Sequence, residues 1–271
     1  MTNLKNKMTI LGSGTSTGIP MVGCDCAVCT STVKENTRLR TSVYLETAQA
    51  SSILIDTTPD LRHQLLKHKI NKVDFAFITH DHADHTHGID DLRPLTFAPK
   101  YSSIPIYTYK KCGAQLTQKF PYIFKANQLP ANIGGGIPNL QLMEVDLSGQ
   151  QKIGAELFEF TMLDHGYTQT LGIIHEKMAY IIDCHQLSSE QIEDLRKREL
   201  ELLIIDCVTN HEHKTHLWQE RTFEYISQIA PKRAGLIHMN HSLEHEQLKK
   251  DAAASFSFEV FPTYDGQVLY Y

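Results

Sequence analysis

Short apolar runs alternate with amphipathic stretches along most of the chain. The apolar runs predict strands, which we place at Met8–Leu11, Ser42–Glu46, Ser52–Ile55, Val73–Ile78, Ile104–Tyr107, Leu157–Leu163, Met178–Ile182, Leu202–Ile205, Ala234–Ile237 and Phe258–Phe261. The stretches between them predict helices at Asp60–His68, Lys110–Lys119, Ser188–Arg198, Leu217–Ile229 and Leu243–Ala254. Ser188 with Gln191 resembles a capping box that opens the third helix. Early hairpins and later strand–helix alternation together predict an α/β protein with two sheets flanked by helices.

Polar residues with metal-binding or catalytic chemistry follow four of these strands. They are His80, His165, Asp183 and His238, each within two residues of the end of an apolar run. A single such residue is more often a satisfied polar side chain at a strand end. Four in one chain favour a shared site at the edge of a rigid scaffold.

The first of these residues opens a dense cluster, His80-Asp81-His82-Ala83-Asp84-His85. Imidazoles and carboxylates are ligands of divalent transition metals. On an extended segment His80 and His82 point the same way, whereas Asp84 and His85 turn toward a second ion as the chain coils. The cluster therefore predicts a two-metal hydrolytic centre, and a solvated polar loop is the alternative.

The composition adds few constraints. With 271 residues, 41% of them hydrophobic and 21% charged, the chain fits one large α/β domain over residues 1–271, and no linker divides it. A net charge of -5 offers no electrostatic footprint for nucleic acid or an anionic membrane. The 15 histidines fit metal binding.

The N-terminus and the cysteines indicate a reducing compartment. Residues 1–7 run into the first strand without an apolar signal core, and no apolar stretch approaches the ~20 residues of a membrane span. We therefore expect a cytoplasmic protein whose six cysteines are thiols or metal ligands instead of disulfides.

Three of the cysteines form a second cluster, Cys24-x-Cys26-x-x-Cys29. A structural zinc requires four soft or borderline ligands, and His241, three residues after His238, can supply the fourth. His245 is a weaker candidate for that position. Such a zinc would tie the N-terminal loop to the wall of the active site, and a reduced cysteine-rich loop is the alternative.

The order HxHxDH followed by isolated His, Asp and His resembles the metallo-β-lactamase superfamily over nearly the whole chain. This resemblance implies an αββα sandwich with a dinuclear metal site at one edge of the two sheets. It assigns one metal to His80, His82 and His165, the other to Asp84, His85 and His238, and the bridging position to Asp183. An aspartate at the bridging position matches the phosphodiesterase branches, because the β-lactamase branch commonly has cysteine there.

A wider set of motifs narrows the resemblance. The PhnP-like branch, which includes phosphoribosyl 1,2-cyclic phosphate phosphodiesterase, is similar in Gly12–Gly18, the cysteine-rich loop, Arg38–Ser42, Asp56–Arg62, Asp90–Pro94 and His238–His241. The resemblance implies a metal-dependent phosphodiesterase that hydrolyses a small cyclic phosphate ester through a metal-bridged hydroxide. Zinc and manganese both fit the two active-site positions, beside one structural zinc.

Two catalytic roles follow from the resemblance. Asp84 would orient the hydroxide as well as bind metal. His216 matches the proposed general acid of the branch, and the neighbouring His213 is the other candidate. For either histidine, an exposed loop position is the alternative.

Three further features have less specific signals. Arg93 could bind a substrate phosphate through its fork of donors or brace Asp90 or Asp91. Asp56, after the strand at 52–55, would orient the histidine-rich loop. Residues 120–136 combine aromatics with three glycines and suit a lid, although a plain surface loop is the more common outcome.

Two other functions share these features. A tRNase Z-like RNA-processing nuclease has the same dinuclear site, but this chain has no long basic insertion and is net negative. A PqqB-like accessory protein of cofactor biosynthesis would bind metal without turnover. The intact set of metal ligands argues against this alternative. We therefore expect a small-molecule phosphodiester as the partner, without nucleic acid or membrane, and the sequence leaves a homodimer open.

Overall fold

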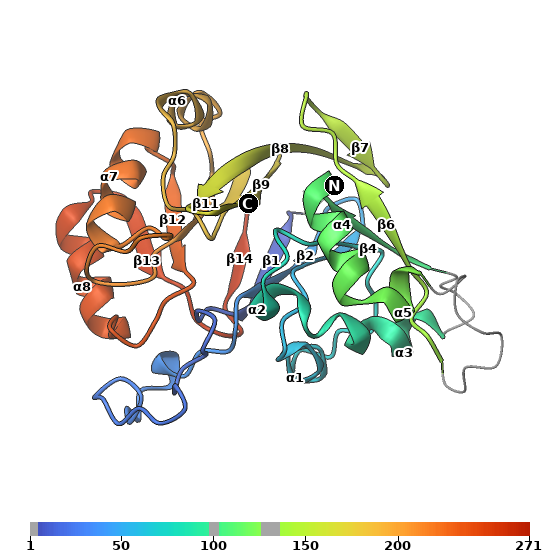
Figure 1. Ribbon diagram of the computed structural model, residues 1–271. Coiled ribbons are helices and arrows are strands. Elements are labelled where there is room, and N and C mark those ends of the chain that lie inside the picture. The colour runs from blue at the N-terminus through green and yellow to red at the C-terminus, as the bar shows by residue number, and fades with distance from the viewer. Residues whose placement is uncertain (1–4, 98–102, 126–135) are drawn as a thin grey trace.

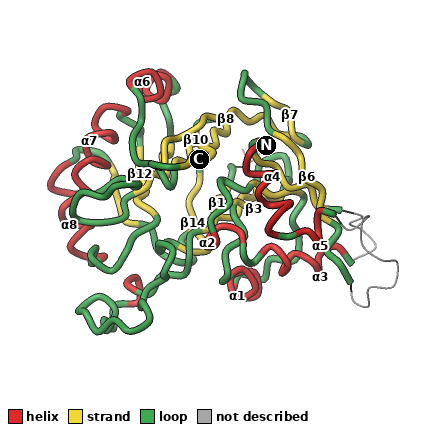
Figure 2. Tube along the Cα trace, in the orientation of Figure 1, coloured by secondary structure: helices red, strands yellow, loops and turns green. Residues whose placement is uncertain are grey.

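Two seven-stranded sheets pack face to face, with helices on their outer sides (Figure 1). The computed structural model describes residues 5–97, 103–125 and 136–271. The order of layers, helix–sheet–sheet–helix, is clearest where helices and strands are coloured separately (Figure 2). This is the αββα sandwich that the sequence predicts.

The first sheet contains the N-terminal half of the chain and one C-terminal strand. Its order is β14 (Val268–Tyr270), β1 (Lys7–Gly12), β2 (Ser42–Glu46), β3 (Ser52–Ile55), β4 (Phe75–Phe77), β5 (Ile104–Thr108) and β6 (Leu140–Glu144). The strands from β14 to β3 pair antiparallel, and those from β3 to β6 pair parallel. Parallel pairing brings the C-terminal ends of β3 and β4 to the same edge.

The second sheet is built in the same mixed way. Its order is β13 (Glu259–Pro262), β12 (Arg233–Ile237), β11 (Leu202–Asp206), β10 (Met178–Ile181), β9 (Thr168–His175), β8 (Glu156–His165) and β7 (Gln151–Ile153). The strands from β10 to β13 pair parallel, whereas β7 to β10 pair antiparallel. The parallel strands β10, β11 and β12 therefore end side by side.

Helices cover both outer faces. On the first sheet lie α1 (Leu61–Lys67) and α4 (Lys110–Lys119), and on the second α6 (Ser189–Lys197), α7 (Gln219–Ile229) and α8 (His245–Ser255). Shorter helical turns are α2 (Ala83–Thr86), α3 (Arg93–Thr96), α5 (Pro121–Phe124) and the 3-10 turns Lys34–Asn36 and Ile89–Leu92. The capping box predicted at Ser188 and Gln191 is confirmed. None of the described helices is long and apolar enough to cross a membrane.

One continuous apolar core runs between the sheets and under α1 and α4. Aromatic rings join the sheets, since the ring centroids of Phe77 in β4 and Phe158 in β8 lie 4.9 Å apart. A second core fills the space between the second sheet and helices α6 to α8. The two cores hold the strand ends in fixed positions.

The predicted strands and helices are present, although their ends are shifted. The structure also contains four further strands and several short helical turns. The strand predicted at 73–78 is confined to Phe75–Phe77. The strands β6, β7, β9 and β14 were not predicted, and each of them is completed by pairing with a neighbouring strand. Within the segment 120–136, Pro121–Phe124 is helical, and residues 126–135 lie outside the described residues, so the lid stays a prediction.

Candidate metal centre

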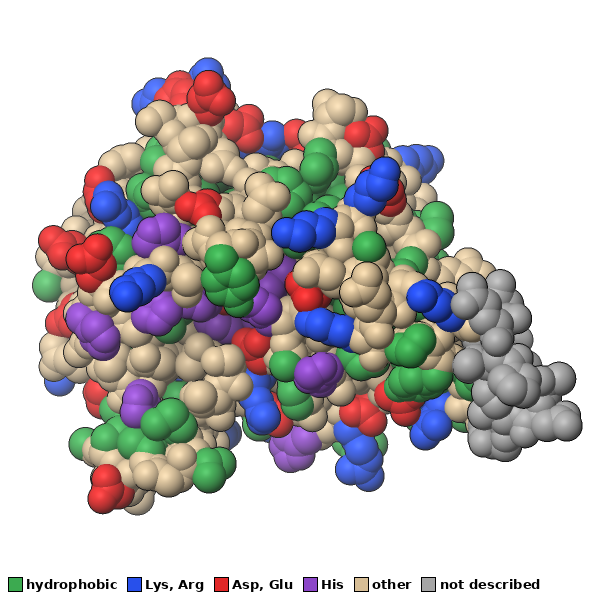
Figure 3. All heavy atoms as spheres, viewed as in Figure 1, with side chains coloured by type: hydrophobic (Ala, Val, Ile, Leu, Met, Phe, Trp, Pro, Cys, Tyr) green, Lys and Arg blue, Asp and Glu red, His purple; other side chains and the backbone are tan. Residues whose placement is uncertain are grey.

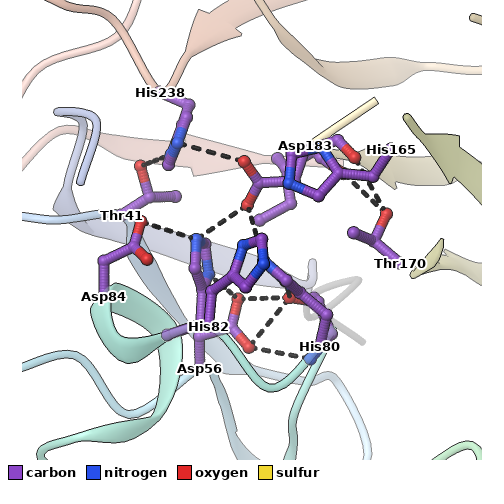
Figure 4. Close-up of polar contacts among 12 residues, drawn as sticks. Thr41, Asp56, His80, His82, Asp84, His165, Thr170, Asp183 and His238 are labelled. Atoms are coloured by element: carbon purple, nitrogen blue, oxygen red, sulfur yellow. Dashed lines mark hydrogen bonds and ion pairs between the residues drawn. The ribbon is translucent and has the colours of Figure 1, made fainter. Parts of the chain in front are cut away.

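The candidate ligands meet where strands of both sheets end, and Figure 4 shows them pointing toward one another. In the second sheet, His165 is the last residue of β8 and His238 directly follows β12. Asp183 lies two residues beyond β10. From the first sheet, the segment 80–85 follows β4 and coils into α2. The strand-end pattern of the sequence thus corresponds to one place in space.

Asp183 occupies the middle of this place. Its Oδ2 lies 2.7 Å from Nε2 of His85 and 3.7 Å from Nε2 of His80. Its Oδ1 lies 3.1 Å from Nε2 of His238. One buried carboxylate therefore reaches histidines of both predicted metal sets.

The ligand atoms of several groups lie within 4.8 Å of one another, close enough to share an ion. These groups are His80, His82 and His165; Asp84, His85 and His238; His80, His85 and Asp183; and His165, Asp183 and His216. The first two are the two predicted metal sets without the bridging aspartate. The last brings a predicted general acid into the same cluster.

Four of the histidines have Nδ1 occupied by the surrounding protein. The partners are Thr79 Oγ1 for His80 (3.1 Å), Asp56 Oδ2 for His85 (2.7 Å), Thr215 O for His165 (2.8 Å) and Thr41 Oγ1 for His238 (2.9 Å). The hydroxyls of Thr79 and Thr41 donate to Asp56 and to the carbonyl of Gly14, so they accept from the rings. Each ring is therefore held at Nδ1 and turns Nε2 toward the centre, where this nitrogen is left for a metal ion.

The fifth histidine is turned the other way. Nε2 of His82 lies 2.8 Å from the hydroxyl of Tyr167, which leaves Nδ1 for the centre. Among the buried polar atoms that lack a hydrogen-bond partner are Nε2 of His80 and of His85 and Oδ2 of Asp183. Buried polar atoms without partners are costly, and this nitrogen and oxygen set suits zinc or manganese. The residues present thus fit two divalent cations.

Three residues around the centre have a left-handed backbone. They are Asp56, Asp183 and His238, with φ of 64°, 48° and 63°. This conformation is uncommon for residues other than glycine. Each follows a strand closely, so the left-handed residue turns its side chain out of the strand direction at the shared edge.

Asp56 connects the first sheet to the histidine-rich segment. It is fully buried, and it accepts hydrogen bonds from the backbone N–H of Thr79 (2.8 Å) and from Nδ1 of His85. Burial raises the pKa of this carboxyl, against the opposing effect of His85 and Thr79. These contacts are the orienting role predicted for Asp56.

The charges in the centre are coupled. Although burial opposes it, the carboxylates of Asp84, Asp183 and Asp56 raise the pKa of His85 well above its ordinary value. Although burial also opposes it there, His238 and His85 lower the pKa of Asp183 well below its ordinary value. The neighbouring histidines therefore favour the ionised form of the Asp183 carboxyl group.

His216 lies inside the centre instead of on an exposed loop. Its Nδ1 is 3.1 Å from Oδ2 of Asp206 and 3.1 Å from Oδ1 of Asp183. Burial works against protonation, but the Asp206 carboxylate outweighs it and raises the pKa of His216 to about 8. His213 is half-buried, with its ring centroid 5.1 Å from that of His216, and burial lowers its pKa. Of the two, the geometry favours His216.

Sequence reasoning missed three residues of this region. Asp206 ends β11 as a buried carboxylate, and it followed an apolar run just as Asp183 does. Tyr167 holds His82 across 85 positions of the chain, which no local pattern signals. Gly166 (φ 73°) makes the turn between β8 and β9, where a Cβ would lie 2.7 Å from the side chain of Thr215. Only the glycine directly after His165 hinted at this turn.

Arg93 makes the bracing contact that the sequence allowed. Its guanidinium lies 3.7 Å from the Asp90 carboxylate and donates to the carbonyl of Gly136 at 3.2 Å. Its side chain is 43% exposed, so one side of the guanidinium faces solvent.

The three cysteines and His241 form a separate cluster. The cysteines lie on the N-terminal loop, the blue loop at the lower left of Figure 1, and His241 lies on the segment after β12. The Sγ atoms of Cys24, Cys26 and Cys29 lie 3.1, 3.6 and 3.7 Å from Nδ1 of His241. Tetrahedral ligands about 2.3 Å from a zinc ion are separated by roughly 3.5–3.8 Å. Two of the three distances fall in that range, the third is shorter, and all four ligand atoms lie within 4.8 Å of one another, so the cluster is compact enough to hold a zinc ion. His245 is not part of it and begins α8.

A buried arginine fixes the far side of this cluster. Arg38 is 1% exposed and donates to the carbonyls of Asn240 (2.9 Å) and Leu243 (2.7 Å), on both sides of His241. Burial lowers the pKa of Arg38 to about 10, although Asp265 opposes this. Arg38 thus fixes the segment that carries His241, independently of any ion bound by the cluster.

Two comparisons decide the family. The sequence profile of the Beta-lactamase superfamily domain matches residues 51–239. The crystal structure of a diphosphatase from the PhnP family is 31% identical, covers 98% of this chain and 97% of its own, and superposes with a TM-score of 0.87. The chain belongs to the PhnP family of the beta-lactamase superfamily. It therefore has the metallo-β-lactamase fold.

Other relatives of this PhnP-family protein have different names. An octanoyltransferase of Porphyromonas gingivalis is 33% identical over 257 residues, which are 95% of this chain and 50% of that protein. The chain thus spans about half the length of that curated relative. Zinc-bound PqqB from Methylobacterium extorquens has a TM-score of 0.76 and covers 97% of this chain and 99% of its own. At 14% identity, PqqB shares the fold alone.

Proposed function

We propose that this PhnP-family protein is a metal-dependent phosphodiesterase that acts on a small cyclic phosphate ester. The observation that carries the proposal is the Asp183 carboxylate, which lies 2.7–3.7 Å from Nε2 of His80, His85 and His238 and so reaches histidines of both sets. A first divalent cation, zinc or manganese, would be held by His80, His82 and His165. A second would be held by Asp84, His85 and His238. When bound, such a pair of cations neutralises phosphoryl oxygens and acidifies a water at neutral pH.

The protein's own groups would then position water and move protons. Oδ2 of Asp84 lies 3.2 Å from Nε2 of His85, so its other oxygen can accept a hydrogen bond from the attacking water. His216 has Nδ1 held by Asp206 and Asp183, which leaves Nε2 to protonate the departing alkoxide. Arg93, partly exposed beside Asp90, is the candidate for a second contact with the substrate phosphate.

We also propose a structural zinc at Cys24, Cys26, Cys29 and His241. His241 and the hydrolytic residue His238 lie on the same short segment after β12. The zinc would therefore hold the N-terminal loop against the wall that carries one catalytic ligand.

Acyl transfer is the second candidate, because the relative from P. gingivalis is named an octanoyltransferase. That name describes a protein twice as long, and the matched half need not carry the activity. An octanoyl chain needs an apolar cavity, whereas the cavity of about 700 Å³ near the centre is lined mainly by polar and hydroxyl groups. The net charge of -5 likewise argues against an RNA substrate.

Turnover by metal-loaded protein tests the proposal. We expect hydrolysis of bis-4-nitrophenyl phosphate and of a cyclic ribose phosphate, and no turnover of a precursor tRNA or an octanoyl thioester. Asp183→Asn is the inactive control, since it keeps the shape and removes the charge. If metal-loaded wild-type protein hydrolyses neither phosphodiester, the proposal is overturned. Octanoyl transfer would favour the second candidate.

A further inference from the structure

The ring of His82 is held less firmly than the rings of the other candidate ligand histidines. Those four rings have Nδ1 bonded inside the protein, whereas Nε2 of His82 contacts the hydroxyl of Tyr167, a side chain that is 79% exposed. An exposed partner constrains a ring less than a buried one, because it keeps rotamer freedom of its own. The position of His82 therefore depends on how the backbone beside it is fixed.

That backbone is fixed by Lys119, the last residue of α4. Its ammonium donates to the carboxylate Oδ2 of Asp81 at 2.5 Å and to the backbone carbonyl of Asp81, which belongs to the peptide plane that leads into His82. In the amide orientation that satisfies both of its ends, Gln115 donates to Oδ1 of Asp81 at 3.1 Å. Gln115 and Lys119 are four residues apart, so one face of α4 supplies both contacts.

These contacts surround a carboxylate with little access to solvent. Asp81 is 7% exposed, and Lys119 is the cation that pairs with it in the described part of the chain. Because side chains alternate along an extended segment, Asp81 is directed to the side opposite His80 and His82. Figure 3 shows acidic (red) and cationic (blue) side chains beside the histidines (purple) near the middle of this face of the molecule. Removal of the cation would leave a nearly buried carboxylate without a counter-charge, which is costly.

The chain after Lys119 continues along the segment that carries the ligands. The ring centroid of Phe120 lies 5.7 Å from that of His87, which directly follows α2. Tyr122 in α5 donates to Oδ1 of Asp90 at 3.0 Å, in the 3-10 turn beyond α2. The junction between α4 and α5 thus contacts the start of this segment, its end and the next turn, so it supports four of the candidate ligands from outside the centre.

We infer that Lys119 is a positioning residue of the metal centre, which acts through Asp81 and sets the metal affinity of the first position, the one that includes His82. The inference rests on the metal centre of the proposed function and adds the group that orders it. The ammonium contacts Asp81 and none of the candidate ligand side chains among the described residues. The second position depends less on Lys119, because Asp56 holds the ring of His85 directly.

Titration with a zinc buffer, read as zinc bound per chain after equilibrium dialysis, tests the inference. Lys119→Met removes the ammonium and keeps the length of the side chain, whereas Lys119→Arg keeps the charge and the donors. Lys110→Met, at the exposed first residue of the same helix, is the matched control. We expect Lys119→Met to weaken one of the two metals of the centre by roughly 10–100-fold. The arginine variant should recover most of this affinity, and the control should match wild type.

Asp81→Asn shows whether the effect passes through Asp81. Because Lys119→Met leaves the carboxylate without its cation, adding Asp81→Asn should restore part of the lost affinity. Further weakening by the added substitution overturns the inference. So does a Lys119→Met protein with a lowered Tm and wild-type zinc midpoints, which is the result for a lysine that serves the fold alone. If Lys119→Met does not fold, the uncharged double variant decides, and wild-type midpoints in it overturn the inference.

Turnover separates this inference from the proposed activity. Wild-type protein that binds its metals and hydrolyses no phosphodiester overturns the phosphodiesterase proposal, while the inference is still decided by the zinc midpoints. Wild-type protein that hydrolyses phosphodiesters, with unchanged midpoints in Lys119→Met, overturns the inference alone. A wild-type centre that binds no metal overturns both.

Discussion

The dinuclear centre and the cysteine cluster are both candidate metal sites, but they are constructed in opposite ways. Ligands of the centre come from strand ends of two sheets, and four of its histidines are each held at Nδ1 by another part of the protein. In the cysteine cluster, three ligands come from one loop, and Cys24 and Cys26 are only partly buried.

The difference is one of dependence: the folded sheets position the ligands of the centre, whereas the fold of the cysteine loop would itself depend on the bound ion. Packed sheets fix the side chains of the centre without the help of an ion, so metals bound there would be free to serve chemistry. The cysteine loop contributes only a small apolar cluster around Ile19, Val28 and Cys29, so it depends on its own ligands for order. We therefore expect substitutions at the centre to affect activity and substitutions at the cluster to affect stability.

The largest expected effect tests the independence of the two sites. Asp183→Asn should reduce phosphodiester hydrolysis to background and remove metal from the centre, because the charge that reaches both histidine sets is lost. Elemental analysis should fall from three metals per chain to one, with the cysteine-bound zinc retained. The exposed α6 variant Asp194→Asn serves as control, and loss of all three metals would contradict the separation.

His216→Ala should come next, with an effect that depends on the leaving group. General-acid catalysis is worth ~10²–10⁴-fold, so hydrolysis of an alkyl ester should slow by about that factor. Nitrophenyl esters should slow little, because nitrophenolate leaves without protonation. Metal content should not change. Equal slowing of both esters would assign His216 to positioning and make His213 the next candidate for the acid.

Thr41→Val tests whether contacts outside the ligand set orient the histidines of the centre for metal binding. The hydroxyl of Thr41 bonds Gly14 and accepts from Nδ1 of His238, and loss of such outer contacts typically costs ~10–100-fold in metal affinity. Titration with a metal buffer should show that loss at one of the two positions. In the control Thr117→Val, a helix hydroxyl bonded to Gly113 is removed. Wild-type affinity in Thr41→Val would show that the tautomer is set elsewhere.

Cys26→Ser should have the smallest effect on chemistry and a clear one on stability. Loss of about 3 kcal/mol of metal-coupled folding free energy would lower the Tm by roughly 6–12 °C in a chain of this size. The hydrolysis rate below the Tm should stay within a few-fold of wild type. Val22→Ser, at a 97% exposed position of the same loop, is the control. An unchanged Tm in Cys26→Ser contradicts a structural zinc.

Both sites were largely predictable, because their signals are local. The run from His80 to His85 and the spacing of Cys24, Cys26 and Cys29 bring ligands together within one turn of chain. Later ligands were found because an apolar strand precedes each, and parallel strands end together. The choice of His241 over His245 follows from the start of α8, which directs His245 away from the thiols.

The contacts that position the ligands could not be predicted in the same way. Tyr167 and its partner His82 lie 85 positions apart, and Asp206 meets His216 ten positions along the chain, so neither contact follows from a local pattern. The strand β9 begins with three polar residues and depends on β8 and β10 for its pairing. The sequence therefore indicated which side chains are candidate ligands, and the structure shows what holds them in place.

The left-handed backbone at Asp56, Asp183 and His238 has an evolutionary consequence. Each such residue costs roughly 1–2 kcal/mol relative to glycine, and all three also place an ionisable group in the interior. Selection for heat resistance without selection for turnover would therefore tolerate or favour replacement at these positions. A library of this sandwich sorted only by thermal survival should keep its sheets and helices while the strand-end chemistry is lost.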